Sequence, residues 1–531
     1  MEFNEQQLQV INSNAEKIVC IASAGAGKTS TLLARIHRLI NDGVQPDSML
    51  ILTFTNAAAQ ELTDRYQRDY KTGITPKFCT FHAFCYSLIA SDINVRSALG
   101  YKNVPDIGTE EDFRKYWILT KQICNVKLTD PKLKGSRDNL AGNDQFVYDI
   151  FWKAYKRQIC EANIISFDIM QDEVSKLFVD NNGIVQKYKD KYKYIAIDEF
   201  QDTEPKEWAF AESFTGANIF TCGDPQQMLY RFRGCTNAII KKLAENPEYE
   251  LIKLPFNYRS TKQIVEYANG IFAERWGEET SYYIRGKANK DGEPIEFCDS
   301  FPKEADKLLP VAVRMTEAVN KGKSVAILCR TNAEVADTRT LFTKLNIPIR
   351  GKSDNSDIIG ILNSSISSEY CVNWLASLLP NEDYARYLRL STLDPTITEE
   401  QKFIQTFGGK FARILEHIYK CRTLLSENKI IFERMRSVIS YLRLNVPLNI
   451  KDHNFLTLQE GIDYIVDVIS VALESGIYIG TIHSVKGLEY DIVHVIGVDG
   501  PSFQTDKNED EAACFYVACT RAKEKLYLWL E

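Results

Sequence analysis

The chain has 531 residues, of which 44% are hydrophobic and 25% are charged, and its formal net charge is −7. Chains of this length usually form more than one hydrophobic core, so we expect two to four domains. No apolar run approaches the roughly 20 residues of a membrane-spanning helix. The acidic start MEFNEQQLQV is unlike a secretory signal. The 13 cysteines are scattered and lack a CxxC pair, which argues against a zinc ribbon or an iron–sulfur cluster. Together these features predict a cytoplasmic enzyme with reduced thiols.

Short apolar runs recur along the chain, and each ends at a polar or glycine-rich turn. In the first half they are KIVCIA (17–22), SMLILTF (48–54), KYIAIDE (193–199) and NIFTCGD (218–224), and helical patterns follow several of them. The second half repeats the pattern with SVAILCR (324–330), DIVHVIGV (491–498) and KLYLWL (525–530). Near-continuous apolar strands that alternate with helices are typical of parallel sheets covered on both faces. The sequence therefore predicts an α/β fold with one such sheet in each half.

Two segments, residues 89–165 and 356–475, lack this strand pattern and are rich in helix formers and aromatic residues. They predict mainly helical insertions into the two α/β domains. The first domain then comprises residues 1–88 and 166–255, and the second comprises residues 256–355 and 476–531. Within the second insertion, residues 386–451 carry twelve Lys and Arg against six Asp and Glu. This stretch is a candidate nucleic-acid patch, although a solvated helical face has the same composition.

The stretch ASAGAGKTS follows the first predicted strand and opens a helix. Small residues let backbone N–H groups surround a phosphate chain at a helix N-terminus, which already favours anions. Lys28 would reach the β and γ phosphates of a nucleotide, and the Thr29 hydroxyl would ligate Mg²⁺. A glycine-rich turn is the alternative, but strand, loop, Lys-Thr pair and helix occur together here. The predicted phosphate loop consists of Ala22, Ser23, Ala24, Gly25, Ala26, Gly27, Lys28, Thr29 and Ser30.

A second motif, YIAIDEFQDT (194–203), places two carboxylates at the end of an apolar strand. Alone, such a pair more often caps a turn than serves catalysis. Beside a phosphate loop, however, Asp198 would hold the metal through water and Glu199 would polarise the attacking water. The sequence therefore predicts an ATP- and Mg²⁺-dependent hydrolysis site.

The stretch GDPQQMLYRFRG (223–234) joins a polar turn directly to aromatic residues and two arginines. A surface turn that leads into a core helix would explain this composition, and so would a loop whose arginines are simply solvated. A third interpretation is a connector between two ligand sites, one lined by polar groups and the other by flat faces and positive charge.

Taken in order, these motifs resemble the superfamily 1A DNA helicases of the UvrD/Rep/PcrA type. The resemblance covers residues 3 to 526 except the two insertions. It rests on FNEQQ, ASAGAGKTS, LTFTNAAAQEL, TFHAF, IDEFQDT, GDPQQMLYRFRG, LPFNYRS, ILCRTNAE, TIHSVKGLEYDIV and FYVACTRAKEKL. It implies two RecA-like P-loop domains with parallel sheets, each carrying a mainly helical insertion.

The resemblance also implies roles around the nucleotide. Gln7 would read the adenine edge, Tyr258 would stack on the base, and Glu489 would meet the ribose. Gln227, with Asp224 beside it, would sense the γ phosphate. Arg259 and Arg521 are similar to the family's two arginine fingers, whose planar guanidinium groups suit the phosphoryl oxygens of the transition state.

A further set of positions matches family contacts to single-stranded DNA. Aromatic faces bind bases without regard to sequence, and each stacked base contributes roughly 1–3 kcal/mol. The matching residues are Phe54, His82, Tyr230, Phe232, Arg233, Arg330 and His483. A core position or a metal site is the alternative for the two histidines, but no Cys/His spacing supports a metal, and DNA contact is the preferred interpretation. In this interpretation the stretch 223–234 links the nucleotide to the grip on DNA.

The sequence departs from the family pattern in three ways. Phe232 stands where the family usually has Trp, and Ala512 and Ala513 stand where it commonly has an Arg pair. The second insertion, near 120 residues, is shorter than in full-length repair helicases. Small members of the family include the helicase subunit of the bacterial Gabija anti-phage system. The reduced, basic insertion would hold duplex DNA, dock an acidic protein partner, or remain a solvated face.

The resemblance predicts an ATP-driven 3′→5′ single-stranded DNA translocase or helicase. Its expected partners are single-stranded or tailed duplex DNA and a protein such as a nuclease, in DNA repair or anti-phage defence, with no membrane partner. The alternative is a nucleotide- and DNA-sensing ATPase that regulates a partner nuclease with little unwinding of its own. An unrelated P-loop enzyme such as a nucleotide kinase is excluded by the second, arginine-bearing domain.

Overall fold

The structure is a computed structural model of the whole chain. It describes residues 2–71, 73–124, 143–277, 280–345, 347–350, 476–500, 503 and 508–531, together with short stretches between residues 361 and 462 (361–365, 371, 415–427, 434, 437–438, 457 and 462). The chain divides into two compact units, Met1–Asp299 with Ile482–Glu531, and Ser300–Thr481. Each unit is described by itself below.

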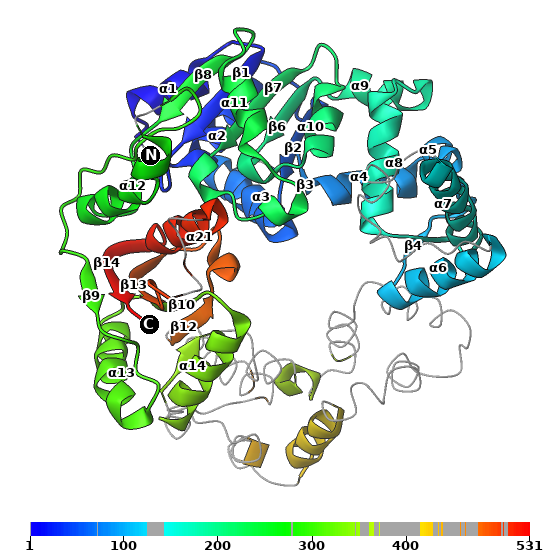
Figure 1. The fold of residues 1–531 in the computed structure, drawn as a ribbon. Helices are drawn as coiled ribbons and strands as arrows, with labels where there is room; N and C mark the ends of the chain where they lie inside the picture. The colour runs from blue at the N-terminus through cyan, green and yellow to red at the C-terminus, as the bar shows by residue number, and fades with distance from the viewer. Residues whose placement is uncertain are drawn as a thin grey trace. The chain divides into compact units, whose positions relative to one another are not determined.

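The first unit contains a six-stranded parallel sheet with the strand order β3-β2-β6-β7-β1-β8 (Figure 1). The four apolar runs predicted in the first half of the chain are all strands of this sheet. The strands are β1 (Lys17–Ala22), β2 (Met49–Thr53), β3 (Lys77–Thr80), β6 (Tyr194–Ile197), β7 (Asn218–Gly223) and β8 (Glu250–Leu254). The predicted α/β fold class with parallel sheets is therefore confirmed.

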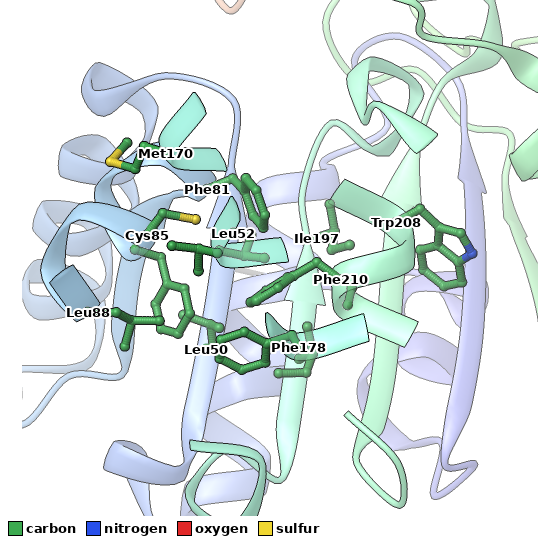
Figure 2. Close-up of a cluster of buried hydrophobic side chains, with 14 of the residues drawn as sticks. Leu50, Leu52, Phe81, Cys85, Leu88, Met170, Phe178, Ile197, Trp208 and Phe210 are labelled. Atoms are coloured by element: carbon green, nitrogen blue, oxygen red, sulfur yellow. The ribbon is translucent and has the colours of Figure 1, made fainter. Parts of the chain in front are cut away.

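Alternate residues of each central strand belong to opposite hydrophobic clusters, so this sheet is buried on both faces. Ile18 and Cys20 of β1 lie in one cluster, whereas Val19 and Ile21 lie in the other. The first cluster is covered by α1 (Glu5–Asn12), α2 (Lys28–Asn41) and α3 (Asn56–Tyr70). The second is covered by α4 (Phe81–Ser91), α8 (Phe167–Val179), α10 (Pro205–Glu212) and α11 (Asn237–Ala244). Figure 2 shows Phe81, Phe178 and Phe210 packed together in this second cluster.

Between β3 and β6 the chain forms a mainly helical segment. The second hydrophobic cluster continues into this segment, since Trp117 and Phe151 both belong to it. Their rings pack edge to face with centroids 4.6 Å apart. Its elements are α5 (Ile93–Ala98), β4 (Asp106–Ile107), α6 (Glu110–Cys124), α7 (Asn143–Glu161), β5 (Ile164–Ile165) and α9 (Gln186–Lys191). Strands β4 and β5 pair in parallel.

The rest of the first unit is formed by later parts of the chain. Strands β13 (Tyr490–Ile496), β14 (Ala522–Trp529) and β9 (Glu296–Cys298) pair in parallel in that order. Two helices, α12 (Lys262–Trp276) and α21 (Glu509–Cys519), pack against each other. Short 3-10 turns lie at η1 (Pro46–Ser48), η3 (Gly183–Val185), η4 (Phe200–Asp202), η5 (Pro225–Gln227), η6 (Arg231–Arg233) and η8 (Ile482–Val485).

The second unit has the same alternation of strand and helix. Strands β11 (Ile349–Arg350), β12 (Ile477–Thr481) and β10 (Val325–Cys329) pair in parallel, and α13 (Ala305–Asn320) and α14 (Asn332–Lys344) pack on them. Most of the predicted second insertion, including most of its basic stretch 386–451, lies outside the described residues. In the part of the chain that the structure describes, no helix is both long enough and apolar enough to cross a bilayer.

One buried cation fastens α1 and α2 to the first sheet. The guanidinium group of Arg35 on α2 is fully buried and donates to the backbone oxygens of Val10 (2.6 Å) and Ser13 (2.8 Å). It also donates to the Tyr194 hydroxyl on β6 at 2.7 Å. Removing this side chain is costly, because the buried Val10 oxygen and Tyr194 hydroxyl lose this donor without regaining water, whereas the Ser13 oxygen still accepts from Arg38.

We predict that Arg35→Ala destabilises the first unit by about 2–4 kcal/mol, through two buried acceptors that lose this donor and a cavity. The measurement is the thermal unfolding midpoint. Arg68→Ala is the matched control, because the Arg68 side chain on α3 is 70% exposed and forms an ion pair with the neighbouring Asp69. Equal midpoints for the two variants would contradict the structural role of Arg35.

Candidate active site

The predicted phosphate loop lies between β1 and α2, as its sequence requires. Ala22 ends β1, residues 23–27 form the loop, and Lys28 begins α2 with Thr29 and Ser30 in its first turn. Gly25 and Gly27 have φ of 66° and 76°, in the left-handed region that favours glycine. A Cβ at Gly25 would also lie 2.5 Å from Oδ1 of Asn257, so the loop tolerates no side chain there. This bend presents the helix N-terminus to an anion.

Three carboxylates surround the Lys28 ammonium group. Asp198 and Glu199 follow β6, and Asp224 follows β7, so all three lie at the carboxyl edge of the parallel sheet. Burial lowers the pKa of Lys28, but the charges of Glu199 and Asp224 outweigh it and raise that pKa above its ordinary value. Lys28 is therefore a permanently charged group at the place where the phosphate chain of a nucleotide would lie.

The two carboxyls of the Asp198–Glu199 pair have different environments. Burial and the adjacent Glu199 raise the pKa of Asp198. Burial also raises the pKa of Glu199, but the ammonium groups of Lys28 and Lys486 outweigh it, so its pKa lies below the ordinary value. Glu199 is thus held ionised, as a general base requires. It also has φ of 52°, a left-handed conformation that is uncommon for a residue with a side chain.

The residues present fit a magnesium ion at this edge. Oδ1 of Asp198 is buried and has no hydrogen-bond partner among the described residues, so an acceptor oxygen is available near Lys28, which begins α2. Mg²⁺ in such sites takes one or two protein ligands and completes its shell with water and phosphate oxygens. The described residues contain no group of three or more His, Cys, Asp or Glu side chains that could hold a metal.

Gln201, which the sequence analysis did not single out, connects the Glu199 carboxylate to the backbone of Asp224. Its Nε2 donates to Glu199 at 2.6 Å, and its Oε1 accepts from the backbone N–H of Asp224 at 3.0 Å. Gly223 allows this close approach, because a Cβ there would lie 2.7 Å from Oε1 of Gln201. The ends of β6 and β7 are thereby held in register at the site.

The loop 223–234 begins among these polar groups. Asp224 accepts from Nε2 of Gln227 at 2.7 Å, and Oε1 of Gln227 accepts from Nη2 of Arg521 at 3.0 Å. Burial, and secondarily Arg259, lower the pKa of Arg521 to about 9, which leaves this side chain protonated at neutral pH. The loop and the predicted arginine finger on the chain after α21 are therefore in direct contact.

The same loop ends among aromatic rings and cations. The rings of Tyr230 and Phe54 stack with centroids 4.3 Å apart, and the Arg233 guanidinium lies 5.1 Å from the Phe54 centroid. Phe232 is 77% exposed, and its ring is the most exposed of this group. His483 packs edge to face on Tyr230 at 6.4 Å. This end of the loop has the composition of a stacking surface for bases.

A cleft in the first unit is lined both by the catalytic candidates and by the candidate DNA contacts. Asp198 and Glu199 line it, and so do Phe54, His82 and Arg233. Burial and the nearby Arg233 lower the pKa of His82, so its ring is neutral at pH 7. His82 packs edge to face on Phe167 at 5.7 Å.

Lys486 is a functional candidate that the sequence analysis missed. It forms an ion pair with Asp202, its ammonium group lies 5.0 Å from the Tyr230 ring centroid, and it contributes to the low pKa of Glu199. Lys486 lies within TIHSVKGLEYD and Asp202 within IDEFQDT, so both motifs contained the signal. The contact between them joins residues 284 positions apart, which a sequence alone does not indicate.

The two candidate base contacts, Gln7 and Tyr258, lie close to the phosphate loop. Gln7 is buried and donates from Nε2 to the backbone oxygen of Ala26 at 3.0 Å. Tyr258 is 59% exposed, its backbone N–H donates to Gly25, and its hydroxyl accepts from Asn4 at 2.6 Å. An exposed ring held at both ends beside the loop is available for stacking.

Arg259, the other candidate finger, contacts a carboxylate. Its Nε donates to Oε2 of Glu489 at 2.7 Å, and its Nη1 donates to the backbone oxygen of Thr520 at 3.2 Å. Arg330, a candidate DNA contact, directly follows β10 in the second unit and is described only within that unit.

The departure at Ala512 and Ala513 is accommodated inside the first unit. Both side chains are buried in α21. In the same helix the first-turn carboxylates of Glu509 and Asp510 pair with Arg231, at 3.2 and 2.7 Å. The loop 223–234 is thus attached to α21 through Arg231 as well as through Gln227.

The site combines a lysine at a helix N-terminus, directly after a buried strand and loop, with an Asp-Glu pair at the end of another strand of the same parallel sheet. This combination defines the class of P-loop nucleotide hydrolases. Within this class, the UvrD/REP helicase N-terminal domain matches residues 3–139 and 109–248, and the UvrD-like helicase C-terminal domain matches residues 252–356 and 368–531. The chain belongs to the UvrD-like helicase family, of superfamily 1A. It is accordingly a DNA-dependent ATPase of the helicase type.

Two similar proteins are named ATP-dependent DNA helicase PcrA, from Staphylococcus epidermidis and Staphylococcus aureus. Each is 25% identical to this chain, over 99% of this chain and 83% of the relative. The similarity therefore extends across both units, and across the segments that the domain matches leave between them.

We predict that Lys28→Ala and Glu199→Gln each lower the ATPase rate by about 100-fold or more, because one removes the phosphate cation and the other the general base. Glu199→Gln should retain nucleotide binding, since an amide leaves Lys28 in place. The measurements are steady-state phosphate release and binding of a fluorescent ATP analogue.

Glu212→Gln serves as the control for charge removal, because Glu212 lies exposed at the end of α10. It should hydrolyse ATP at the parent rate. Hydrolysis by Glu199→Gln at that same rate would show that Glu199 is not the base.

Proposed function

We propose that the protein is an ATP-driven translocase that moves 3′→5′ along single-stranded DNA and separates strands at a duplex. The observation that carries this proposal is the loop 223–234. One end contacts the candidate nucleotide residues and the other presents stacked aromatic rings and Arg233. We further propose the domain boundaries 1–88 with 166–255, and 256–355 with 476–531, interrupted by insertions 89–165 and 356–475.

In this proposal the nucleotide site uses residues of the first unit only. Gln7 and Tyr258 bind the base, Glu489 binds the ribose, and Lys28 binds the β and γ phosphates. Thr29 and Asp198 hold Mg²⁺, which when bound neutralises phosphate charge. Glu199, kept ionised by Lys28 and Lys486, accepts the proton of the attacking water. The remaining phosphate contacts are assigned to Gln227, Arg259 and Arg521.

Single-stranded DNA is proposed to lie on the exposed aromatic end of the loop. Phe232 is available to stack on a base because most of its ring is exposed, and Phe54 and Tyr230 already form a stacked pair beside it. Arg233 supplies positive charge near a phosphate. His82, His483 and Arg330 complete the proposed set.

Coupling of the two ligands follows from the short covalent path between them. Gln227 and Tyr230 are three residues apart, and Arg521 contacts the first while Lys486 contacts the ring of the second. A γ phosphate that attracts Arg521 and Gln227 would shift the base-stacking end of the loop. Loss of that phosphate after hydrolysis would reverse the shift, and alternation of this kind drives stepwise movement.

We also propose a protein partner, such as a nuclease, in DNA repair or anti-phage defence. Support comes from the basic composition of residues 386–451 in an otherwise acidic chain. Charge complementarity would speed encounter with an acidic partner surface.

We predict that removing the exposed end of the loop uncouples ATPase activity from DNA. Phe232→Ala should weaken single-stranded DNA binding by roughly 1–3 kcal/mol through lost stacking, with an unchanged salt dependence. Arg233→Ala should instead reduce the salt dependence of binding, because it removes one phosphate contact. The double variant should lose most DNA stimulation of the ATPase while its affinity for nucleotide stays near that of the parent.

The matched control is Phe297→Ala with Arg68→Ala, which removes an exposed ring on β9 and an exposed arginine on α3. It should bind DNA and respond to it as the parent does. Equal DNA stimulation in parent and Phe232→Ala/Arg233→Ala would refute the assignment of the loop.

A second experiment separates a motor from a regulatory sensor. We predict that the purified chain unwinds a 3′-tailed duplex, but not a 5′-tailed one, at the ATP concentration that saturates its DNA-stimulated ATPase. The measurement is strand release beside phosphate release in one reaction. DNA-stimulated hydrolysis without unwinding of either substrate would favour the alternative, a nucleotide- and DNA-dependent regulator of a partner nuclease.

A further inference from the structure

Glu489 has two cationic partners, one on each carboxylate oxygen. Arg259 donates from Nε to Oε2 at 2.7 Å, and the Lys523 ammonium group lies 3.2 Å from Oε1. Lys523 also lies 3.9 Å from Asp491. Burial raises the pKa of Glu489, but Arg259 and Lys523 outweigh it and hold that pKa below its ordinary value. Glu489 is therefore an ionised group shared between two positive charges.

This shared ion pair matters because one of the two cations, Arg259, is also proposed to bind the nucleotide. In the function proposed above, on which this inference rests, Arg259 contributes charge to the phosphate chain of ATP. The bond from Nε to the Glu489 carboxylate occupies the edge of the guanidinium group that carries Nε, while Nη1 is bonded to the Thr520 carbonyl, so the Nε edge cannot form a forked contact with phosphoryl oxygens. To offer that edge to phosphate, Arg259 has to leave Glu489.

The remaining partner decides how difficult that departure is. Without Lys523, Arg259 would be the only cation paired with Glu489 among the described residues, and separating them would leave a partly exposed carboxylate without an ion pair. With Lys523 in place, the carboxylate keeps an ion pair after Arg259 moves. The two cations also repel each other across the same carboxylate, which further weakens the hold on Arg259.

We propose that Lys523 is a positioning residue for ATP hydrolysis, which neutralises Glu489 and thereby releases Arg259 to the nucleotide. Lys523 does not touch the nucleotide in this scheme and acts only through Glu489. Its place on β14 suits the role, because β14 pairs with β13, which begins at Tyr490 directly after Glu489. The backbone oxygen of Lys523 also accepts from Thr261, two residues after Arg259.

The chain offers a matched control on the same strand. Lys525 lies two residues further along β14 and is also ion-paired, with Glu293 at 2.7 Å and Glu296 at 3.4 Å. Neither Glu293 nor Glu296 is a candidate site residue. Lys525→Met therefore removes the same charge and a comparable ion pair from the same strand.

The test is steady-state ATPase kinetics with saturating single-stranded DNA on the full chain. Lys523→Met should lower kcat about two- to fivefold, the size of a partly exposed charge coupling, and leave KM for ATP within twofold. Lys523→Arg should retain the parent kcat, and Lys525→Met should match the parent in both constants. In a Glu489→Gln background, Lys523→Met should cause no further loss of kcat, because the carboxylate it neutralises is gone.

The proposal is overturned if Lys523→Met has the same kcat as the parent. It is also overturned if Lys523→Met lowers kcat by the same factor in the Glu489→Gln background as in the parent. A raised KM with unchanged kcat overturns it as well, since that pattern indicates a direct effect on nucleotide binding. Arg259→Ala distinguishes these results from failure of the proposed function. If Arg259→Ala hydrolyses ATP at the parent rate, the finger assignment itself is wrong, whereas a large loss there with an unaffected Lys523→Met removes only this inference.

Discussion

The buried lysine of the phosphate loop is the group on which the rest of the site depends. Lys28 lies within the protein, where burial lowers its pKa, and the nearby Glu199 and Asp224 raise that pKa above its ordinary value. Those carboxylates in turn need cations and donors, which Lys486 and Gln201 supply. A parallel sheet makes this arrangement possible, because it brings the carboxyl ends of distant strands to one edge. Each charge at that edge is therefore stable only in the presence of the others.

This mutual dependence explains why the nucleotide and DNA candidates are not independent sites. Lys486 pairs with Asp202, contributes to the low pKa of Glu199 and also lies over the Tyr230 ring. Arg521 reaches the loop 223–234 through Gln227, and Arg231 of the same loop pairs with the first turn of α21. A change of charge at the phosphate position would thus alter the position of the aromatic end of the loop 223–234, because the side chains between them are already in contact.

Much of the fold and part of the site could be predicted from the sequence because their signals are local. The strand runs were recognisable since both faces of the first sheet are buried, so each strand is almost wholly apolar. The phosphate loop and the Asp198–Glu199 pair each lie within one short motif. Arg35, Gln201, Lys486 and Lys523 were not predicted, because their importance arises from partners far away in the chain. The Lys523–Glu489 and Lys486–Asp202 pairs exist only once the strands and turns are assembled.

At Glu199, the residue that hydrolysis requires is not the residue that would make the backbone most stable. Its left-handed conformation costs roughly 1 kcal/mol for a residue with a Cβ, and glycine or asparagine would occupy it more comfortably. Selection for stability alone would thus replace Glu199, whereas selection for hydrolysis would retain it. A population of variants sorted only for thermal tolerance would be expected to drift away from glutamate at this position and to lose turnover as it gained resistance to heat.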